Sequence, residues 1–192
     1  MGNEYGSKQP VGCQFNLSVM SDDFVDVILS ALEETETAEV MMVTDDVSSS
    51  VHGPISEVFA VVESIYLNAA QTGKHVAMSG TFSVGCPETH EENDLETPTG
   101  STAPRRGVAQ QAGCKFALYP LGTEDYMEII QSRINAAAKE GVKVSASHGA
   151  TRLDGDVHDI FNALESAFLK VQEAAGHTAM TFTLSSNSPS NR

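Results

Sequence analysis

The segment from His75 to Pro87 alternates between apolar and small polar side chains, which predicts a strand with one buried face. One face carries Val76, Met78, Phe82 and Val84, and the other carries Ala77, Ser79, Thr81 and Ser83. The segment from His177 to Pro189 repeats this pattern 102 residues later, with Met180, Phe182 and Leu184 on the apolar face. A constant offset kept through a whole strand predicts two copies of one unit.

The first copy predicts the order strand–helix–strand–strand–helix–strand. Strands are expected at Gln14–Met20, Val40–Val43 and Ser48–His52, followed by the His75 segment. A first helix is expected after Ser21-Asp22-Asp23, with the apolar stripe Phe24, Val27, Ile28, Ala31 and Leu32. A second is expected from Gly53-Pro54 to Gly73, with the stripe Ile55, Val58, Phe59, Val62, Tyr66 and Ala69.

The second copy repeats this order. Gly113–Leu121 matches Gly12–Met20 at an offset of 101, with one residue inserted before the next helix. That helix carries Tyr126, Ile129, Ile130 and Ile134 and ends at Gly141; strands follow at Val142–Ala146 and Gly149–Leu153. The last helix begins at Asp154-Gly155-Asp156 and carries Val157, Ile160, Phe161, Leu164, Phe168 and Val171.

These patterns predict an α+β fold made of two tandem ferredoxin-like (βαββαβ) repeats with ACT-like sheet packing. Helices cover one face of each sheet, and the repeats either pack sheet against sheet or close a larger sheet. The expected organisation is an N-terminal arm at 1–11, a first repeat at 12–87, a polar linker at 88–112 and a second repeat at 113–190.

The charge balance narrows the classes of partner. The net charge is −15 and the sequence pI about 4.6, so binding to nucleic acid is disfavoured. No apolar run is long enough to cross a membrane and no leader pattern is present, so we expect a cytoplasmic protein that is not membrane-embedded. The three cysteines lack zinc-ligand spacing, and neither a metal nor a cofactor is expected.

Candidate binding chemistry is expected beside the small hydroxyl-bearing face of the sheet. The first repeat offers Asp45, Asp46, Ser48, Ser49 and Ser50, and the second offers Ser147, His148, Ala150, Thr151 and Arg152. Many hydroxyls with little charge suit a flat heteroaromatic ligand. Two simpler interpretations stay open: the hydroxyls pack or face solvent, and Asp45-Asp46 forms a solvated turn.

The sequence contains no pattern that specifies a nucleophile with its base. Gly-x-Ser-x-Gly, Gly-x-Gly-x-x-Gly and a phosphate loop are absent, and His148 and His158 have no ligand partner at metal spacing. His75 and His177 start equivalent strands, and a structural role with a backbone or serine partner is expected for both. The sequence therefore favours binding over catalysis.

Several blocks resemble the YkoF family of thiamin- and hydroxymethylpyrimidine-binding proteins. They are Gly12–Leu17, Met20–Phe24, Ser79–Pro87, Cys114–Pro120, Leu153–Asp159 and Leu184–Ser190. The resemblance covers nearly all of the chain except the linker. It implies a homodimer, one ligand site per repeat, and binding without turnover of thiamin or its pyrimidine precursor. It also implies a cytoplasmic role in uptake of that precursor, with a vitamin-precursor transporter as partner and vitamin B1 transport as the process.

The implied ligand suggests roles for particular residues. The backbone of Leu17 and the Ser49 hydroxyl would bind the pyrimidine, with Phe15 or Phe82 as a wall and Asp45 or Asp46 near the thiazolium. In the second repeat the candidates are Leu118, Thr151, Phe116 and His148. One departure is that Leu17-Ser18-Val19-Met20 lacks the Tyr-Pro pair of Leu118-Tyr119-Pro120-Leu121, which bears on ligand preference in the first site.

Two other functions remain open from the residues. One is an enzyme on a dimeric ferredoxin-like sheet that uses His148 or Asp46 as a base. The other is an ACT-like regulatory module that senses another small metabolite and acts on a partner enzyme.

Overall fold

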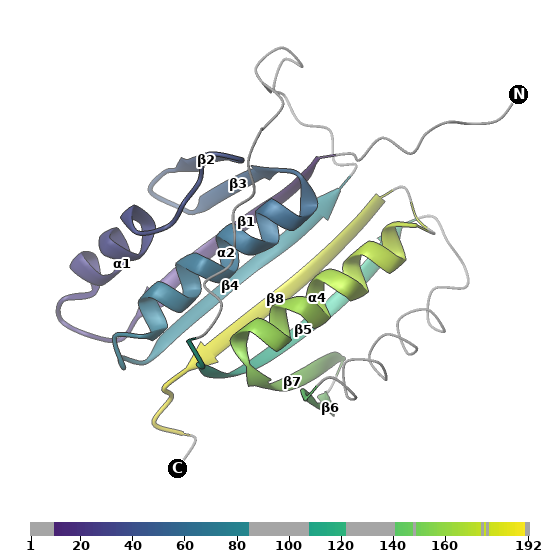
Figure 1. Ribbon diagram of the computed structural model, residues 1–192. Helices are drawn as coiled ribbons and strands as arrows, with labels where there is room; N and C mark the ends of the chain where they lie inside the picture. Colours follow the sequence, from purple (N-terminus) through teal and green to yellow (C-terminus); the bar gives the residue numbers. More distant parts are fainter. Residues whose placement is uncertain are drawn as a thin grey trace, which may run out of the picture.

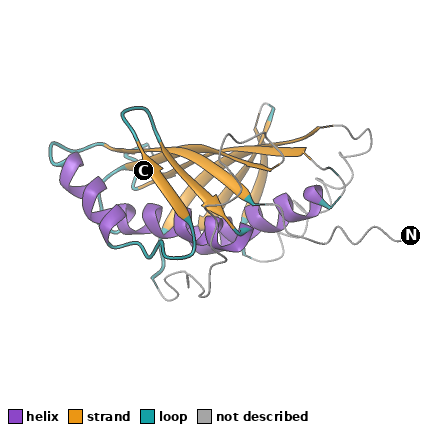
Figure 2. Cartoon of the chain, turned by 90° about the horizontal axis from the view of Figure 1, so that it is seen from above, coloured by secondary structure: helices purple, strands orange, loops and turns teal. Residues whose placement is uncertain are grey.

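A computed structural model describes residues 10–84, 108–121, 141–147, 149–173, 175 and 177–190. Within these residues, eight strands form one antiparallel sheet in the order β2-β3-β1-β4-β8-β5-β7-β6. The helices α1, α2 and α4 all cover the same face (Figures 1 and 2). Each half of the sheet has the strand order of a ferredoxin-like unit, which confirms the predicted α+β fold of two repeats.

The elements follow the predicted order. In the first repeat they are β1 (Val11–Val19), α1 (Phe24–Glu33), β2 (Met41–Thr44), β3 (Ser49–Gly53), α2 (Ile55–Ala70) and β4 (Val76–Val84). In the second they are β5 (Gln111–Leu121), β6 (Lys143–Ser147), β7 (Ala150–Asp156), α4 (Val157–Gln172) and β8 (His177–Ser186). The predicted helix that carries Tyr126 and most of the predicted linker lie outside the described residues.

The predicted start of the last helix is only partly right. Asp154 and Gly155 belong to β7, and Asp156 is both the last residue of β7 and the N-cap of α4. The Asp156 carboxylate then accepts the backbone N–H of His158 at 3.0 Å and caps α4. Strand and helix thus meet without a loop, a junction that periodicity alone does not indicate.

The alternation of side chains sorts the sheet into two faces as predicted. Phe15, Met78 and Met180 are buried beneath the helices. Ser79, Thr181 and Thr183 point the other way and are exposed. We call this second surface the hydroxyl face, made by Ser79, Thr81 and Ser83 of β4 and Thr181, Thr183 and Ser185 of β8.

Helix α2 is buried well beyond its predicted apolar stripe. Every residue from Val58 to Ala70 is buried, including Glu63, Ser64 and Asn68. The helix packs against α1, α4 and the sheet, so it lies at the centre of the helical layer (Figure 1). A helix in this position places polar groups where each needs a protein partner.

The two repeats join edge to edge through β4 and β8. Their antiparallel ladder runs from Val76–Ser186 to Val84–Thr178. Phe82 of β4 stacks on Phe59 of α2 with ring centroids 3.9 Å apart and also contacts Phe168 and Phe182 of the second repeat. One hydrophobic core therefore continues through both repeats. Of the two predicted arrangements, the joined sheet is the one found within the chain.

Candidate functional site

The first candidate site lies where the β1–β3 ladder ends. The last paired residues are Phe15 and Ser49, so Leu17 lies two residues beyond the end of the ladder. On the other side, the N–H of Met20 donates to the C=O of His75 at 2.9 Å. Because bonding direction alternates along an antiparallel strand, the N–H and C=O of Leu17 point toward the β3 side. They face the turn between β2 and β3, with no ladder partner there among the described residues.

The same geometry recurs in the second repeat. The β5–β7 ladder ends at Phe116 and Thr151, so Leu118 lies two residues beyond it. The N–H of Val157 donates to the C=O of Gln110 at 2.8 Å. Because bonding direction alternates along the strand, the backbone N–H and C=O of Leu118 point toward the β7 side. Gly149 stands opposite with a φ of 82°, a conformation that glycine adopts without steric cost. His148 lies outside the described residues.

The turn beside Leu17 is held by Asp45. Its Oδ1 accepts the backbone N–H groups of Val47 and Ser48 at 2.8 and 2.9 Å. These two donors lower the pKa of the Asp45 carboxyl below its usual value. Asp45 and Asp46 are both exposed, as the turn interpretation expects. The Asp45 carboxylate is thus ionised and fixed at the edge of the site.

The adjacent serines point to opposite faces of the sheet. Ser49 pairs with Phe15 and lies on the helix-covered face, where its Oγ is 2.9 Å from the Thr44 hydroxyl. Ser50 pairs with exposed Gln14 and lies on the uncovered face. Thr151 resembles Ser49, because it pairs with buried Phe116 and so lies on the helix-covered face. The prediction that Ser49 and Thr151 belong beside the hydroxyl face is therefore wrong, because the register places both beneath the helices.

The three candidate aromatic walls do not lie together. Phe15 and Phe116 each end a ladder and are next to Leu17 and Leu118 in their own strands. Phe82 is fully buried between the repeats, stacked on Phe59. The structure thus brings together Phe15, Leu17 and Ser49 in one repeat and Phe116, Leu118 and Thr151 in the other, and it places Phe82 in the shared core.

The remaining histidines differ in their contacts. His75 Nε2 is 3.1 Å from the Ser185 hydroxyl, in agreement with the expected backbone or serine partner. His177 is exposed. His158 was expected to lack a Cys or His companion at metal-ligand spacing, and its Nδ1 is instead 3.0 Å from Oε1 of buried Glu63. This pair joins α2 to α4, and the only sequence signal for it is a carboxylate within an apolar helix.

The described residues contain no group of three or more histidine, cysteine or acidic side chains placed to hold a metal ion. Cys13 and Cys114 are free and buried, and burial raises the pKa of the Cys114 thiol to about 12. Such a thiol stays protonated and is a poor nucleophile. None of the described helices is long and apolar enough to span a bilayer.

Comparison with known proteins agrees with the two-repeat architecture. The YKOF-related family matches residues 10–89 and 111–191, one match for each repeat. The chain belongs to this family. It is 40% identical over 191 residues to the Bacillus subtilis (strain 168) protein named "Putative HMP/thiamine-binding protein YkoF", covering 97% of this chain and 95% of that one.

Two solved structures each match part of the chain. A domain of unknown function, DUF77, from Bacillus cereus is 19% identical, with a TM-score of 0.36, and covers 40% of this chain and 75% of its own. The hypothetical protein MJ1052 from Methanocaldococcus jannascii is 20% identical, also with a TM-score of 0.36, and covers 39% of this chain and 78% of its own.

Proposed function

We propose that this protein binds thiamin or its hydroxymethylpyrimidine precursor, without turnover, at one site in each repeat. The observation that carries the proposal is the recurrence of one arrangement at both ladder ends. Leu17 next to Phe15 and Ser49 has its counterpart in Leu118 next to Phe116 and Thr151. The 40% identical relative is named for binding HMP and thiamine, which supports this choice of ligand.

The chemistry of the ladder ends suits an aminopyrimidine. Such a ring presents nitrogen acceptors beside an amino donor, and an extended backbone beyond its ladder offers one N–H and one C=O on the same side. The hydroxyl of Ser49 or Thr151 serves as a third, adjustable partner. Phe15 or Phe116, each buried next to its ladder end, would form the apolar wall behind the ring. We keep Phe82 only as a distant support, because it stacks on Phe59 in the core shared by the two repeats.

The two sites are expected to differ in their preference for charge. Thiamin carries a positive thiazolium, and Asp45 with Asp46 places carboxylates at the edge of the first site. The second repeat has Ser147 and His148 at the corresponding positions, together with Tyr119-Pro120 in place of Ser18-Val19. The first site should therefore favour thiamin over the neutral precursor more strongly than the second.

We further propose that the protein is a cytoplasmic homodimer that supplies the precursor after uptake, with a vitamin-precursor transporter as its partner. The hydroxyl face supports the dimer, because its six side chains are small and uncharged and the helices leave them uncovered (Figure 2). A neutral surface of small side chains lets a second sheet approach closely. Two copies that join there would leave the ladder ends accessible.

Calorimetric titration of the purified protein with thiamin and with hydroxymethylpyrimidine tests the proposal. We expect the titration to show two sites per chain. Mass spectrometry should show that the ligand is unchanged after incubation with the protein. Ser49→Ala should weaken one site by roughly five- to tenfold, the effect of one lost hydrogen bond to a neutral ligand. Ser50→Ala is the matched control, because it removes the same hydroxyl from the adjacent residue on the opposite face.

Three results would contradict this function. Equal loss of affinity in Ser49→Ala and Ser50→Ala would rule out a binding site at the end of the β1–β3 ladder. Turnover of either ligand would favour the enzyme that uses Asp46 or His148 as a base. Binding of neither ligand would favour a regulatory module for another metabolite.

A further inference from the structure

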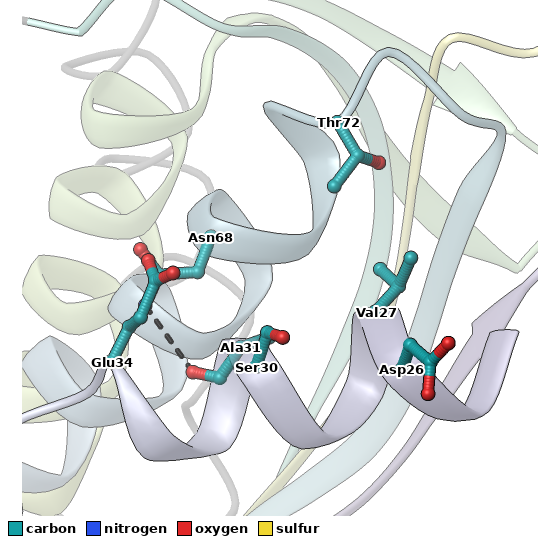
Figure 3. A pocket seen from close by; sticks show the side chains of 7 residues that line it. All are labelled: Asp26, Val27, Ser30, Ala31, Glu34, Asn68 and Thr72. Carbon is teal, nitrogen blue, oxygen red and sulfur yellow. Dashed lines mark hydrogen bonds between the residues drawn. The ribbon is translucent and has the colours of Figure 1, made fainter. Parts of the chain in front are cut away.

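A groove between α1 and α2 lies apart from both ladder ends. Its volume is about 180 Å³, smaller than the roughly 300–1,000 Å³ of sites for drug-sized ligands. Figure 3 shows the lining residues, five from α1 and its C-terminal end and two from the end of α2. They are Asp26, Val27, Ser30, Ala31, Glu34, Asn68 and Thr72.

Asn68 in this groove has an amide oxygen without a partner. The residue is only 8% exposed, and its Oδ1 is buried and accepts no hydrogen bond from the residues that the structure describes. Its Nδ2 donates to the C=O of Ala31 at 3.2 Å and to the Thr35 hydroxyl at 3.1 Å. A buried acceptor that is left unpaired destabilises the folded state, so a ligand that supplies a donor here would be favoured.

The orientation of this amide is fixed by its neighbours. The C=O of Ala31 only accepts, so the amide atom facing it must be the nitrogen. The Thr35 hydroxyl already donates to Ala31 at 2.8 Å, so it too is left to accept from Asn68. Rotating the amide would place its oxygen against these two acceptors. The unpaired oxygen therefore stays on the side of the amide that faces away from the Ala31 carbonyl and the Thr35 hydroxyl.

The other polar groups of the groove are also mainly acceptors. The Thr72 hydroxyl donates to the C=O of Ala69 at 2.7 Å, so its oxygen is left with lone pairs only. Asp26 and Glu34 contribute carboxylates, and in Figure 3 the Glu34 side chain extends toward the Asn68 amide. Lys74, two residues after Thr72, has its ammonium on Asp23 instead.

We propose that this groove is a second binding site, for a small cation with N–H donors such as a primary alkylammonium. The ammonium would donate to Asn68 Oδ1 and to the Glu34 carboxylate, and Val27 with Ala31 would contact its short alkyl group. Both groups are acceptors, and the ammonium would give the buried amide oxygen of Asn68 the donor that it lacks. The net charge of −15 further favours a cation at this surface.

The second repeat has no counterpart of the Asn68 amide. At the repeat offset of 102 residues, the position of Asn68 is occupied by Lys170, whose ammonium contacts Glu173. A lysine at this place brings its own N–H donors and positive charge. We therefore expect the cation site in the first repeat only, in contrast to the paired ladder-end sites.

NMR titration of the ¹⁵N-labelled full chain with ethylammonium tests the proposal. We expect saturable shifts of the Asn68 side-chain NH₂ signals and of α1 amides. Tetramethylammonium has the same charge but no N–H donor, and it should leave the Asn68 signals unshifted. Asn68→Leu, which keeps the volume and the Thr35–Ala31 hydrogen bond, should weaken ethylammonium binding at least about tenfold.

Glu34→Gln provides a second test that does not depend on the buried amide. Loss of this rim carboxylate should weaken binding roughly two- to fivefold. Glu33→Gln is the matched control, because it makes the same charge change one residue away on exposed α1 and outside the groove. Absence of saturable ethylammonium shifts would overturn the proposal. Equal weakening by Glu33→Gln and Glu34→Gln would also overturn it, because general charge attraction explains that result.

Discussion

Glu63 shows how one buried side chain links pH to stability. The carboxylate is 4% exposed on α2 and lies 3.0 Å from Nδ1 of His158 on α4. Burial raises its pKa above the usual value of 4.5, and the nearby Asp156 and Glu165 act in the same direction. The contact with His158 lowers the pKa, but burial has the larger effect. The folded protein therefore holds a proton on Glu63 more tightly than the unfolded chain does.

This raised pKa predicts a loss of stability as pH increases. Between pH 4.5 and the raised pKa the folded state binds more protons, so the free energy of unfolding falls as pH rises, by at most about 1.4 kcal/mol per unit. Glu63→Gln removes this group, so wild type should lose stability relative to the variant across that window. Urea unfolding of both proteins at several pH values measures the difference. A difference that stays constant, or that grows in favour of wild type, would refute the assignment.

At the residue scale, the sequence predicted that helices cover the apolar face of the sheet, but it did not assign every strand residue to the correct face. Phe82 was correctly placed on the apolar side. Ser49 was grouped with Ser50 because the two are adjacent in a serine run, yet the register separates them. The Glu63–His158 contact spans 95 residues, and no local pattern reveals such a pair.

At the scale of elements, α4 depends on a single acidic residue at its start. Asp156 accepts the N–H of His158 at 3.0 Å through Oδ1 and the N–H of Gln110 at 2.9 Å through Oδ2. One side chain thus caps the helix and fixes the start of β5. By contrast, α2 begins after Pro54 without a side-chain cap.

Removing this cap should destabilise the protein measurably. Asp156→Ala is expected to lower the free energy of unfolding by about 1–2 kcal/mol, the usual cost of losing an N-cap side chain. Asp156→Asn should cost less, because the amide oxygen still accepts from His158 while only the bond to Gln110 is lost. Equilibrium urea unfolding compares the three proteins. The cap would be unimportant if Asp156→Ala matched wild type.

Helix α2 shows where element prediction is limited. Periodicity located the helix and its stripe through Phe59 and Tyr66, and the structure buries both. Periodicity did not indicate that Asn68 on the same helix is buried, because that depends on how α1 packs beside it. The candidate groove was missed for the same reason. It arises from two helices that are distant in sequence, whereas the ladder ends arise from strand patterns and the repeat.

At the scale of the whole molecule, one residue pair in the β4–β8 ladder lies at the centre of the symmetry that relates the two repeats. Gly80 pairs with Phe182, and these residues are themselves related by the 102-residue offset. Exchanging the repeats maps this pair onto itself, so it marks the pseudo-twofold axis. A Cβ at Gly80 would lie 2.9 Å from a Phe182 ring carbon and 2.7 Å from the Gln14 carbonyl oxygen. The two repeats differ at this position, with glycine in the first and phenylalanine in the second. The space at the axis holds only one large side chain.

This crowding predicts that Gly80→Ala weakens both repeats together. The added methyl group meets backbone as well as Phe182, so we expect a loss of about 1–3 kcal/mol in the free energy of unfolding, typical of an overpacked core. Hydrogen exchange measured by mass spectrometry should show faster exchange in β1 and in β5. Ser79→Ala is the matched control, because it changes the adjacent residue on the exposed hydroxyl face. Faster exchange in β1 alone would show that the two repeats unfold separately and that the shared core does not couple them.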